Sequence, residues 1–220
     1  MDVKFLCLRE SDLERVMDWR MRPYITRYMN TDPKLTLDGQ KRWFRRITED
    51  DSQMHWIVSF DERPIGLLNL MDIDRVNLRC SWGYYIAERE YRSLKLAMYL
   101  EWNLYDYVFD ELKLHKLCNE TFVENEQVVR LHQLCGSRQD GVMRQHIFKS
   151  GKFYDVSIGS IIADEWSERR KHVVYEKFWF ESFSPPPIGY SLTSFIVRCD
   201  YELLIESTKR GRFHEEAIAA

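Results

Sequence analysis

The stretch Cys80-Ser-Trp-Gly-Tyr-Tyr-Ile86, followed by Arg92-Ser-Leu-Lys-Leu-Ala97, decides the fold that we expect for this chain. The first part has the composition of a strand, and the second opens a long helical pattern. The start of a helix stabilises an anion, because several backbone N–H groups lack intrahelical partners and the helix dipole is positive there. We therefore expect this junction to hold a phosphate, with the charge of Arg92 beside it. The alternative is a strand-turn-helix corner without a ligand.

Composition indicates a globular protein with one main core. The chain has 220 residues, 45% of them hydrophobic, and a formal net charge of -3. No basic stripe is present, so nucleic acid is not an expected partner. Five cysteines without a CxxC pair favour a reducing, cytoplasmic setting over a disulfide framework. No apolar run is long enough to predict a membrane span.

The order of predicted elements indicates an α+β protein with a mixed, mostly antiparallel sheet and flanking helices. Alternation, helical spacing and turn residues define these elements. In order they are a strand at 3–9, a helix capped by Ser11 or Asp12, a helix at 36–49, strands at 55–60, 65–71 and 79–87, a helix at 92–109, a strand at 116–123, a helix at 125–134, and a hairpin of strands at 141–149 and 153–162.

This order, with an anion-ready turn after the fourth strand, resembles the GCN5-related N-acetyltransferase (GNAT) superfamily. Its pyrophosphate loop reads Arg/Gln-x-x-Gly-x-Gly/Ala, and Arg92, Lys95 and Ala97 stand at the marked positions. Lys95 replaces the central glycine, which places a side chain where backbone approaches a phosphate. Either Lys95 pairs with a phosphate as a point charge, or it weakens cofactor binding.

Four further motifs carry a closer resemblance to the N-acetyltransferase family of pseudaminic acid biosynthesis, in addition to the Trp82-Gly-Tyr-Tyr-Ile86 strand. In the superfamily's last conserved helix, His132 stands in place of the usual tyrosine, between Asn125 and Gly136. The match spans about 8–166. The motifs are Phe109-Asp-Glu-Leu-Lys-Leu-His-Lys-Leu117, Leu131-His132, Asp140-Gly-Val-Met-Arg-Gln-His146 and Lys149-Ser-Gly-Lys-Phe-Tyr-Asp-Val156.

The resemblance implies an enzyme that transfers acetyl from acetyl-CoA to the 4-amino group of a UDP-linked aminodideoxy sugar, by direct attack of the amine on the thioester. It implies no metal, and no metal-ligand spacing is present in the sequence. The cofactor-binding residues that it implies are Tyr84, Tyr85, Ile86, Arg92, Ser93, Leu94, Lys95, Leu96, Ala97, Asn125 and His132.

Two residues are candidates for proton transfer. Glu120 lies in a strand of apolar and small residues, where desolvation would raise its pKa and suit it to accept an amine proton; the alternative is a solvent-facing glutamate. His132 can protonate the leaving thiolate, or it can be a structural histidine. A backbone N–H near Tyr84 or Tyr85 is the candidate donor to the oxyanion. Asn125 contacts the cofactor by resemblance, and is otherwise a helix N-cap.

The acceptor pocket is less well marked in the sequence. Met29, Trp43, Tyr84 and Glu120 are the candidate substrate-binding residues, since nucleotide and sugar faces suit aromatic and apolar walls. Packing in the core is the alternative for Met29 and Trp43. Other acceptors remain open, namely a polyamine or a protein N-terminus. A catalytically silent CoA-binding scaffold or sensor is the alternative of another class.

We divide the chain into an acetyltransferase domain at 1–166 and a C-terminal extension at 167–220. The extension begins with a charged linker candidate at 167–171, and it contains the triple proline at 185–187 and an apolar segment at 195–205. None of it matches the family, so its role is undefined. The sequence leaves a homodimer open.

Overall fold

The computed structural model describes residues 2–183. The first half of the described chain contains the predicted strand, two helices and three-stranded meander, together with a short helix, α2, that was not predicted. Their bounds are β1 Val3–Cys7, α1 Leu13–Met21, α2 Pro23–Thr26, α3 Leu37–Thr48, β2 Met54–Phe60, β3 Arg63–Asp74 and β4 Arg79–Ile86.

The second half follows the predicted order as well, and then continues past it. Its elements are α4 Leu94–Asp106, β5 Lys116–Phe122, α5 Glu126–Cys135, β6 Arg138–Lys149, β7 Lys152–Ile162, α6 Ala163–Arg169 and β8 Trp179–Phe180. Short 3-10 segments stand at Glu10–Asp12, Arg89–Tyr91 and Arg170–His172, and a π-helical turn, Tyr107–Glu111, prolongs α4.

Capping residues explain several of these bounds. The Thr36 hydroxyl accepts a hydrogen bond from the Gly39 amide at 3.2 Å and so begins α3. Gly136 ends α5 with φ +117°, a conformation that favours glycine, and a Cβ there would lie 2.6 Å from Arg169 Cδ. The predicted stop at Gly136 is therefore confirmed. The predicted helices at 36–49 and 125–134 match α3 and α5 to within one residue at each end, whereas α2 and α6 were not predicted.

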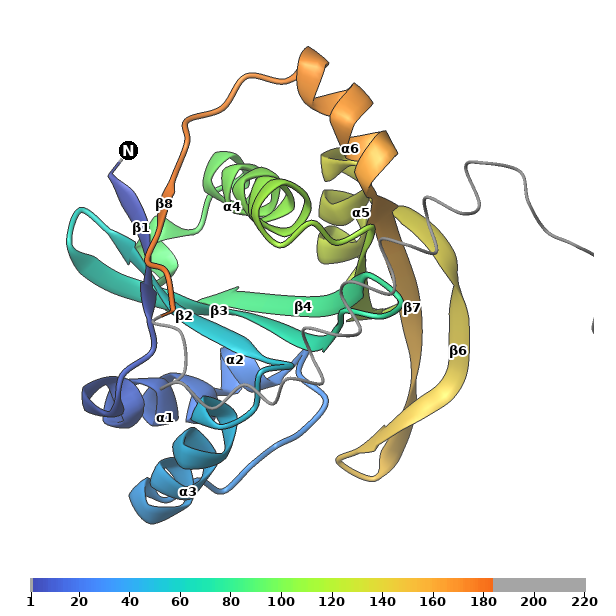
Figure 1. Cartoon of the computed structure of the whole chain (residues 1–220). Helices are drawn as coiled ribbons and strands as arrows, with labels where there is room; N and C mark the ends of the chain where they lie inside the picture. Colours follow the sequence, from blue (N-terminus) through green and yellow to red (C-terminus); the bar gives the residue numbers. More distant parts are fainter. Residues whose placement is uncertain (1, 184–220) are drawn as a thin grey trace, which may run out of the picture. The chain divides into compact units, whose positions relative to one another are not determined.

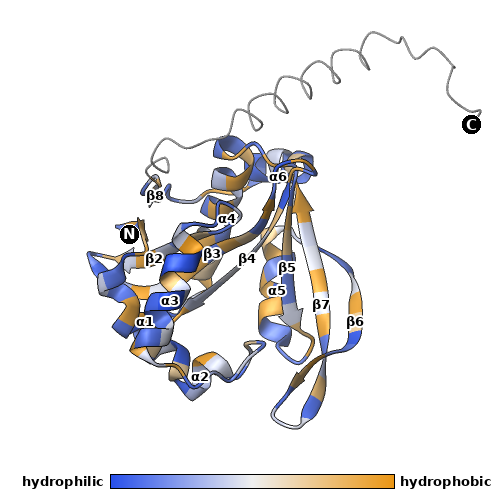
Figure 2. Cartoon of the chain, turned by 60° about the horizontal axis from the view of Figure 1, so that its bottom comes forward, coloured by the Kyte–Doolittle hydropathy of each residue, from blue (hydrophilic) through white to orange (hydrophobic). Residues whose placement is uncertain are grey.

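The strands of the described chain form one mixed sheet of eight strands, in the order β6-β7-β5-β4-β3-β2-β1-β8. Helices α1, α2 and α3 cover one face and α4, α5 and α6 cover the other (Figure 1). The helices carry both polar and apolar residues (Figure 2), as expected for helices that pack on a sheet. This architecture confirms the predicted α+β fold.

Each face has its own apolar cluster. Trp19 of α1, Ile57 of β2 and Leu67 of β3 belong to the cluster on the α1–α3 face. Leu68 of β3, Leu100 of α4 and many other residues build the larger cluster on the α4–α6 face. Because side chains alternate along a strand, consecutive residues of β4 point to different faces.

Strands β4 and β5 are parallel and pair only at their first residues. β5 then pairs with β7 as far as Phe122, and β4 pairs with β3 as far as Ile86. The two strands therefore separate after their third pair. The paired residues are Arg79 with Lys116, Cys80 with Leu117, and Ser81 with Cys118.

The segment after 166 differs from the prediction. Helix α6 crosses that position, so the expected linker at 167–171 is helical. Further on, β8 pairs in parallel with β1, and the Glu181 carboxylate accepts the Cys7 amide at 2.8 Å. One compact unit therefore runs to Ser182. The triple proline and the segment at 195–205 lie outside the described residues.

Candidate active site

Beyond the Ser81–Cys118 pair, where β4 and β5 separate, strand β4 makes a close contact with strand β3. A Cβ at Gly66 would lie 2.2 Å from the Tyr85 carbonyl oxygen, so only glycine fits there. The amides of Ala87 and Glu88 both donate to the Ile65 carbonyl, at 2.7 and 3.2 Å. This bend ends β4 beside the start of α4, where we expect the cofactor.

The turn into α4 is arranged differently from our expectation for Arg92. Its Nε and Nη2 donate to the Ile86 carbonyl at 2.8 and 2.6 Å, and the guanidinium lies 4.9 Å from the ring centre of Tyr24. Burial lowers the pKa of Arg92. Arg92 therefore fixes the turn against the end of β4 instead of projecting toward a ligand.

The first amides of α4 are partly satisfied within the helix. The Ser93 hydroxyl accepts from the Leu96 amide at 3.2 Å, and the Ser93 carbonyl accepts from Ala97 at 3.0 Å. Leu94 is exposed, and no hydrogen bond is found for its amide or that of Lys95 among the described residues. These two amides are the donors that the turn offers to an anion.

Lys95 does not cover those amides. Its ammonium lies 3.8 Å from Glu176 Oε1 and 5.3 Å from the ring centre of Tyr99, one turn further along α4. The side chain thus extends toward the C-terminal end of the helix. The residue that replaces the superfamily's glycine leaves the start of α4 accessible.

A buried carboxylate organises the α4–α6 face next to the separating strands. Glu101 of α4 is fully buried and accepts from the Tyr105 hydroxyl at 2.9 Å and the Tyr84 hydroxyl at 3.5 Å. His132 Nδ1 lies 3.0 Å from Glu101 Oε1. Burial, and then the Glu101 charge, raise the pKa of Tyr84 and of Tyr105 well above their usual range, so both remain donors.

Aromatic packing holds this group in place. The rings of Trp82 and Tyr84 are stacked, 5.6 Å apart and 3° from parallel. The His132 ring meets Trp82 at a steep angle, with 5.1 Å between ring centres. We call Tyr84, Glu101, Tyr105 and His132 the Glu101 cluster. Tyr84 was predicted to line the acceptor pocket, but its side chain belongs to this cluster.

The α1–α3 face presents a different pair, Arg20 and Tyr85. Arg20 Nη2 donates to the Thr31 hydroxyl at 3.3 Å. Arg20 Nη1 and the Tyr85 hydroxyl are both buried, and neither has a hydrogen-bond partner within residues 2–183. Burial lowers the pKa of Arg20 and raises that of Tyr85, yet an arginine remains charged.

The β6–β7 hairpin is fastened to the segment that follows α2. Lys149 is buried, and its ammonium donates to the carbonyls of Thr26, Arg27 and Met29 and forms an ion pair with Asp32 at 3.1 Å. The ammonium thereby joins two segments that border the α1–α3 face on the side of β5. The half-buried Met29 packs against the apolar cluster of that face.

A family comparison identifies this arrangement. The family model described as "Acetyltransferase (GNAT) domain" matches residues 4–138. The chain belongs to this family. Membership confirms the predicted superfamily and the predicted class, an acetyl-CoA-dependent N-acetyltransferase.

Individual relatives of this GNAT acetyltransferase are distant. Spermidine N(1)-acetyltransferase of Vibrio cholerae is 24% identical over 163 residues, 74% of this chain and 94% of that protein. Acetyltransferase PseH of Campylobacter jejuni is 25% identical over 129 residues, 59% of this chain and 78% of that protein. A crystal structure of the Vibrio enzyme with CoA and spermine has a TM-score of 0.71 at 23% identity, covering 76% of this chain and 98% of that one.

Glu120, the predicted base of this GNAT acetyltransferase, is exposed between the buried Asn119 and Thr121. The desolvation that we expected for its carboxylate is therefore absent. The Ser81–Cys118 pairing puts its side chain on the α1–α3 face, which Tyr85 also faces. A role for Glu120 as the base stays a prediction, and burial no longer supports it.

The contacts of Trp43 and Asn125 bear on the roles that we predicted for them. Trp43 is half-buried and meets His55 edge-on at 5.4 Å, which supports packing in the core. The Asn125 carbonyl accepts from the amides of Val128 and Val129, but its side chain makes no cap hydrogen bond. Asn125 therefore occupies the N-cap position of α5, as one of the two interpretations expected, and its side-chain amide is left available to a ligand.

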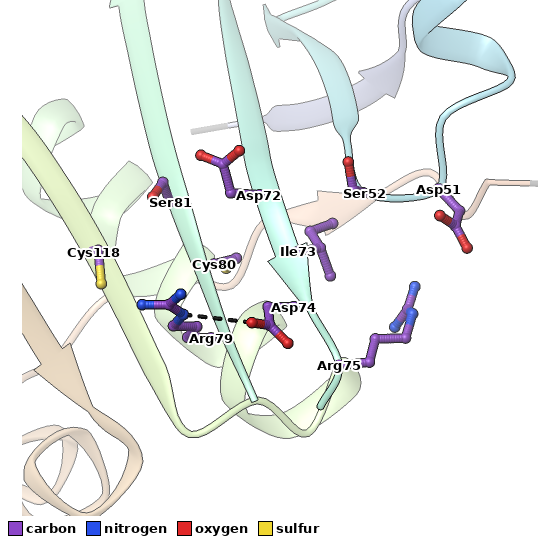
Figure 3. Close-up of a pocket in the computed structure, with 10 residues that line it drawn as sticks. All are labelled: Asp51, Ser52, Asp72, Ile73, Asp74, Arg75, Arg79, Cys80, Ser81 and Cys118. Carbon is purple, nitrogen blue, oxygen red and sulfur yellow. Dashed lines mark ion pairs between the residues drawn. The ribbon is translucent and has the colours of Figure 1, made fainter. Parts of the chain in front are cut away.

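A broad cavity of about 790 Å³ opens beside the last β4–β5 pair. Figure 3 shows its lining, with an ion pair of 3.6 Å between Asp74 and Arg79. Two arginines therefore offset most of the charge of three aspartates. The lining residues are Asp51, Ser52, Asp72, Ile73, Asp74, Arg75, Arg79, Cys80, Ser81 and Cys118.

Sequence analysis did not single out Arg20 or Glu101. An arginine on the core-facing spacing of α1 was the signal available for Arg20. The signal available for Glu101 was its position in an otherwise apolar stretch of α4. Within residues 2–183 no helix is long and apolar enough to cross a membrane, and no group of three or more His, Cys, Asp or Glu is placed to hold a metal ion.

Proposed function

We propose that this acetyltransferase moves acetyl from acetyl-CoA to the 4-amino group of a UDP-linked aminodideoxy sugar. The observation that carries this choice of acceptor is the pair of buried, unpartnered donors on the α1–α3 face, Arg20 Nη1 and the Tyr85 hydroxyl. A nucleotide diphosphate supplies anionic oxygens to such donors. A polyamine supplies only further cations and N–H donors, which a buried arginine repels.

The cofactor fits the α4 side of the separating strands. The free amides of Leu94 and Lys95 would hold the CoA diphosphate at the start of α4. The pantetheine arm would run along the end of β4, from Tyr84 to Ile86, within reach of the Asn125 side chain. The reacting thioester would then lie near His132, with the acceptor on the α1–α3 face.

Direct transfer assigns one task to each group. The amine attacks the thioester carbonyl carbon, a C–N bond forms, and the C–S bond breaks. A β4 backbone N–H near Tyr84 or Tyr85 would stabilise the oxyanion, a contribution of about 3 kcal/mol for one such donor. His132 gives a proton to the leaving thiolate, and Glu120 takes the amine proton directly or through water.

A polyamine is the second candidate acceptor. It is favoured by the spermidine N-acetyltransferases among the relatives and by the three aspartates in the cavity. Against it stand Arg75 and Arg79 in the same cavity, and Arg20 on the same face. The lining is close to neutral, and a trivalent cation gains little from a neutral surface.

An acceptor panel tests the proposal. Release of CoA thiol would be measured with UDP-linked 4-amino-4,6-dideoxy sugars, with spermidine and spermine, and with a peptide N-terminus. We expect turnover with a nucleotide sugar and at most weak turnover with the amines. Turnover of polyamines alone would identify a polyamine, and not a nucleotide sugar, as the acceptor. Tight acetyl-CoA binding without turnover of any amine would leave a silent scaffold and overturn the proposal.

A further inference from the structure

Glu101 and His132 form a buried carboxylate–imidazole pair that joins α4 to α5. Glu101 has no exposed surface and His132 is 7% exposed, with 3.0 Å between Oε1 and Nδ1. We infer that Glu101 is a positioning residue, which fixes the proton of His132 on Nδ1 and directs Nε2 to the reacting thioester. This inference rests on the role of His132 in the proposed function.

Hydrogen-bond chemistry determines where the proton lies. The tyrosine hydroxyls donate to Glu101, Tyr105 at 2.9 Å and Tyr84 at the longer 3.5 Å. A carboxylate has about four lone-pair sites and only accepts, so it accommodates these donors together with an N–H from the histidine. Nδ1 must therefore carry hydrogen, and Nε2 holds the proton that can be given away.

The surroundings of the ring direct Nε2 away from α4. Nδ1 faces Glu101, so the other nitrogen lies on the opposite side of the ring. His132 also lines a small hollow with Asn119 and Thr121 of β5, and no hydrogen-bond partner for Nε2 is found in the part of the chain that the structure describes. Nε2 therefore lies toward the β5 side of the opening, free for substrate.

The pair also balances charge in a buried site. An imidazolium at His132 next to the Glu101 carboxylate forms a neutral pair, so the acid form needs no other counterion. After Nε2 gives its proton to the thiolate, Nδ1–H still bonds to the carboxylate. The ring therefore keeps its orientation throughout proton transfer, and solvent restores the proton on Nε2.

A structural role for Glu101 would leave the tautomer unaffected, and this difference defines the experiment. Long-range ¹H–¹⁵N spectra of ¹⁵N-histidine protein without substrate would be recorded at alkaline pH, and a His132→Gln variant would assign the His132 signals. We expect protonated Nδ1 and bare Nε2 in the wild type. Glu101→Gln should move the proton toward Nε2, and lower kcat by about 10- to 100-fold with KM for acetyl-CoA within about twofold.

Tyr175→Phe is the matched control, because it removes a hydroxyl that donates to the Asp106 carboxylate of α4 at 2.6 Å and leaves the Glu101 cluster intact. It should keep the Nδ1–H tautomer and kcat within about threefold of wild type. Equal losses in both variants, or an Nε2–H tautomer in the wild type, would overturn the inference. The wild-type spectrum decides the point even when Glu101→Gln does not fold. A fixed tautomer in a protein that acetylates no acceptor would refute the proposed function alone.

Discussion

Two buried histidines of this protein have the same exposure and opposite surroundings. His132 and His55 are each 7% exposed. Nδ1 of His132 faces the Glu101 carboxylate, whereas Nδ1 of His55 is buried with no partner among residues 2–183, and Nε2 of His55 lies 3.2 Å from a Gln53 oxygen. Burial lowers the pKa of His55 to about 4. Burial thus disfavours the charged form of the His55 imidazole, whereas the His132 imidazole has a carboxylate in hydrogen-bond contact.

The two faces of the sheet differ in the same way. On the α4–α6 face, the Glu101 carboxylate accepts from Tyr105 and lies against His132 Nδ1, although Trp82 Nε1 nearby is buried without a partner among residues 2–183. On the α1–α3 face, Arg20 Nη1 and the Tyr85 hydroxyl are left without partners. Each buried polar group without a partner costs about 1–3 kcal/mol, a cost that a ligand removes when it binds. We infer that the Glu101 carboxylate has its partners before substrate arrives, and that the acceptor supplies partners to the donors of Arg20 and Tyr85.

Removing the supported histidine should have the largest effect. His132→Ala should lower kcat at least about 100-fold, because a positioned acid contributes 10²- to 10⁴-fold. Affinity for acetyl-CoA should change little, since the diphosphate site lies at the start of α4. Steady-state kinetics with isothermal titration would measure both. A kcat within threefold of wild type would remove His132 from the mechanism.

Removing Arg20, the cation without a partner for Nη1, should have the second-largest effect on activity. Arg20→Ala should lower kcat/KM for a nucleotide-linked acceptor by about 30-fold, the loss expected for one charge-assisted hydrogen bond. A small neutral amine should react at the wild-type rate. Arg15→Ala is the control, because Arg15 lies on the same helix and pairs with Asp12 at the surface. An equal loss with the neutral amine would point to a folding defect.

The unsupported histidine should make stability depend on pH. His55 titrates near 6.5 when unfolded and about 4 when folded, and Asp50 only partly opposes the effect of burial. Its stabilising contribution is therefore present above pH 6.5 and is lost as the pH falls through 4. Between pH 7 and pH 5 the loss should be about 2 kcal/mol. Urea unfolding of wild type and His55→Gln would measure it; parallel pH profiles would contradict it.

The exposed carboxylate should have the smallest effect. Glu120→Gln should lower kcat by about 10-fold, less than for a buried base, because water at an exposed site can replace it. Acetyl-CoA affinity should not change. An equal loss of turnover and cofactor affinity would make Glu120 a structural residue. Glu124→Gln, beyond the end of β5, is a control at a surface carboxylate that pairs with Lys152.

Local chemistry explains how far the sequence could predict the structure. Thr36 and Gly136 act on their own neighbours, so the start of α3 and the end of α5 were predictable. The burial of Glu101 depends on Tyr84, which is 17 positions away, and on His132, which is 31 away. No local sequence pattern predicts these contacts between distant residues. Glu120 shows the reverse error, since apolar sequence neighbours do not determine which face of a strand reaches solvent.

The pairing of β8 with β1 affects how this protein can be shortened. The Phe180 ring lies on Phe5 with 4.0 Å between centres, and on Tyr107 with 4.5 Å. A fragment that stops at the end of the family match would leave the β1 backbone open to pairing with another molecule and would bare these rings, a recognised cause of aggregation. Expression fragments should therefore extend at least to Ser182.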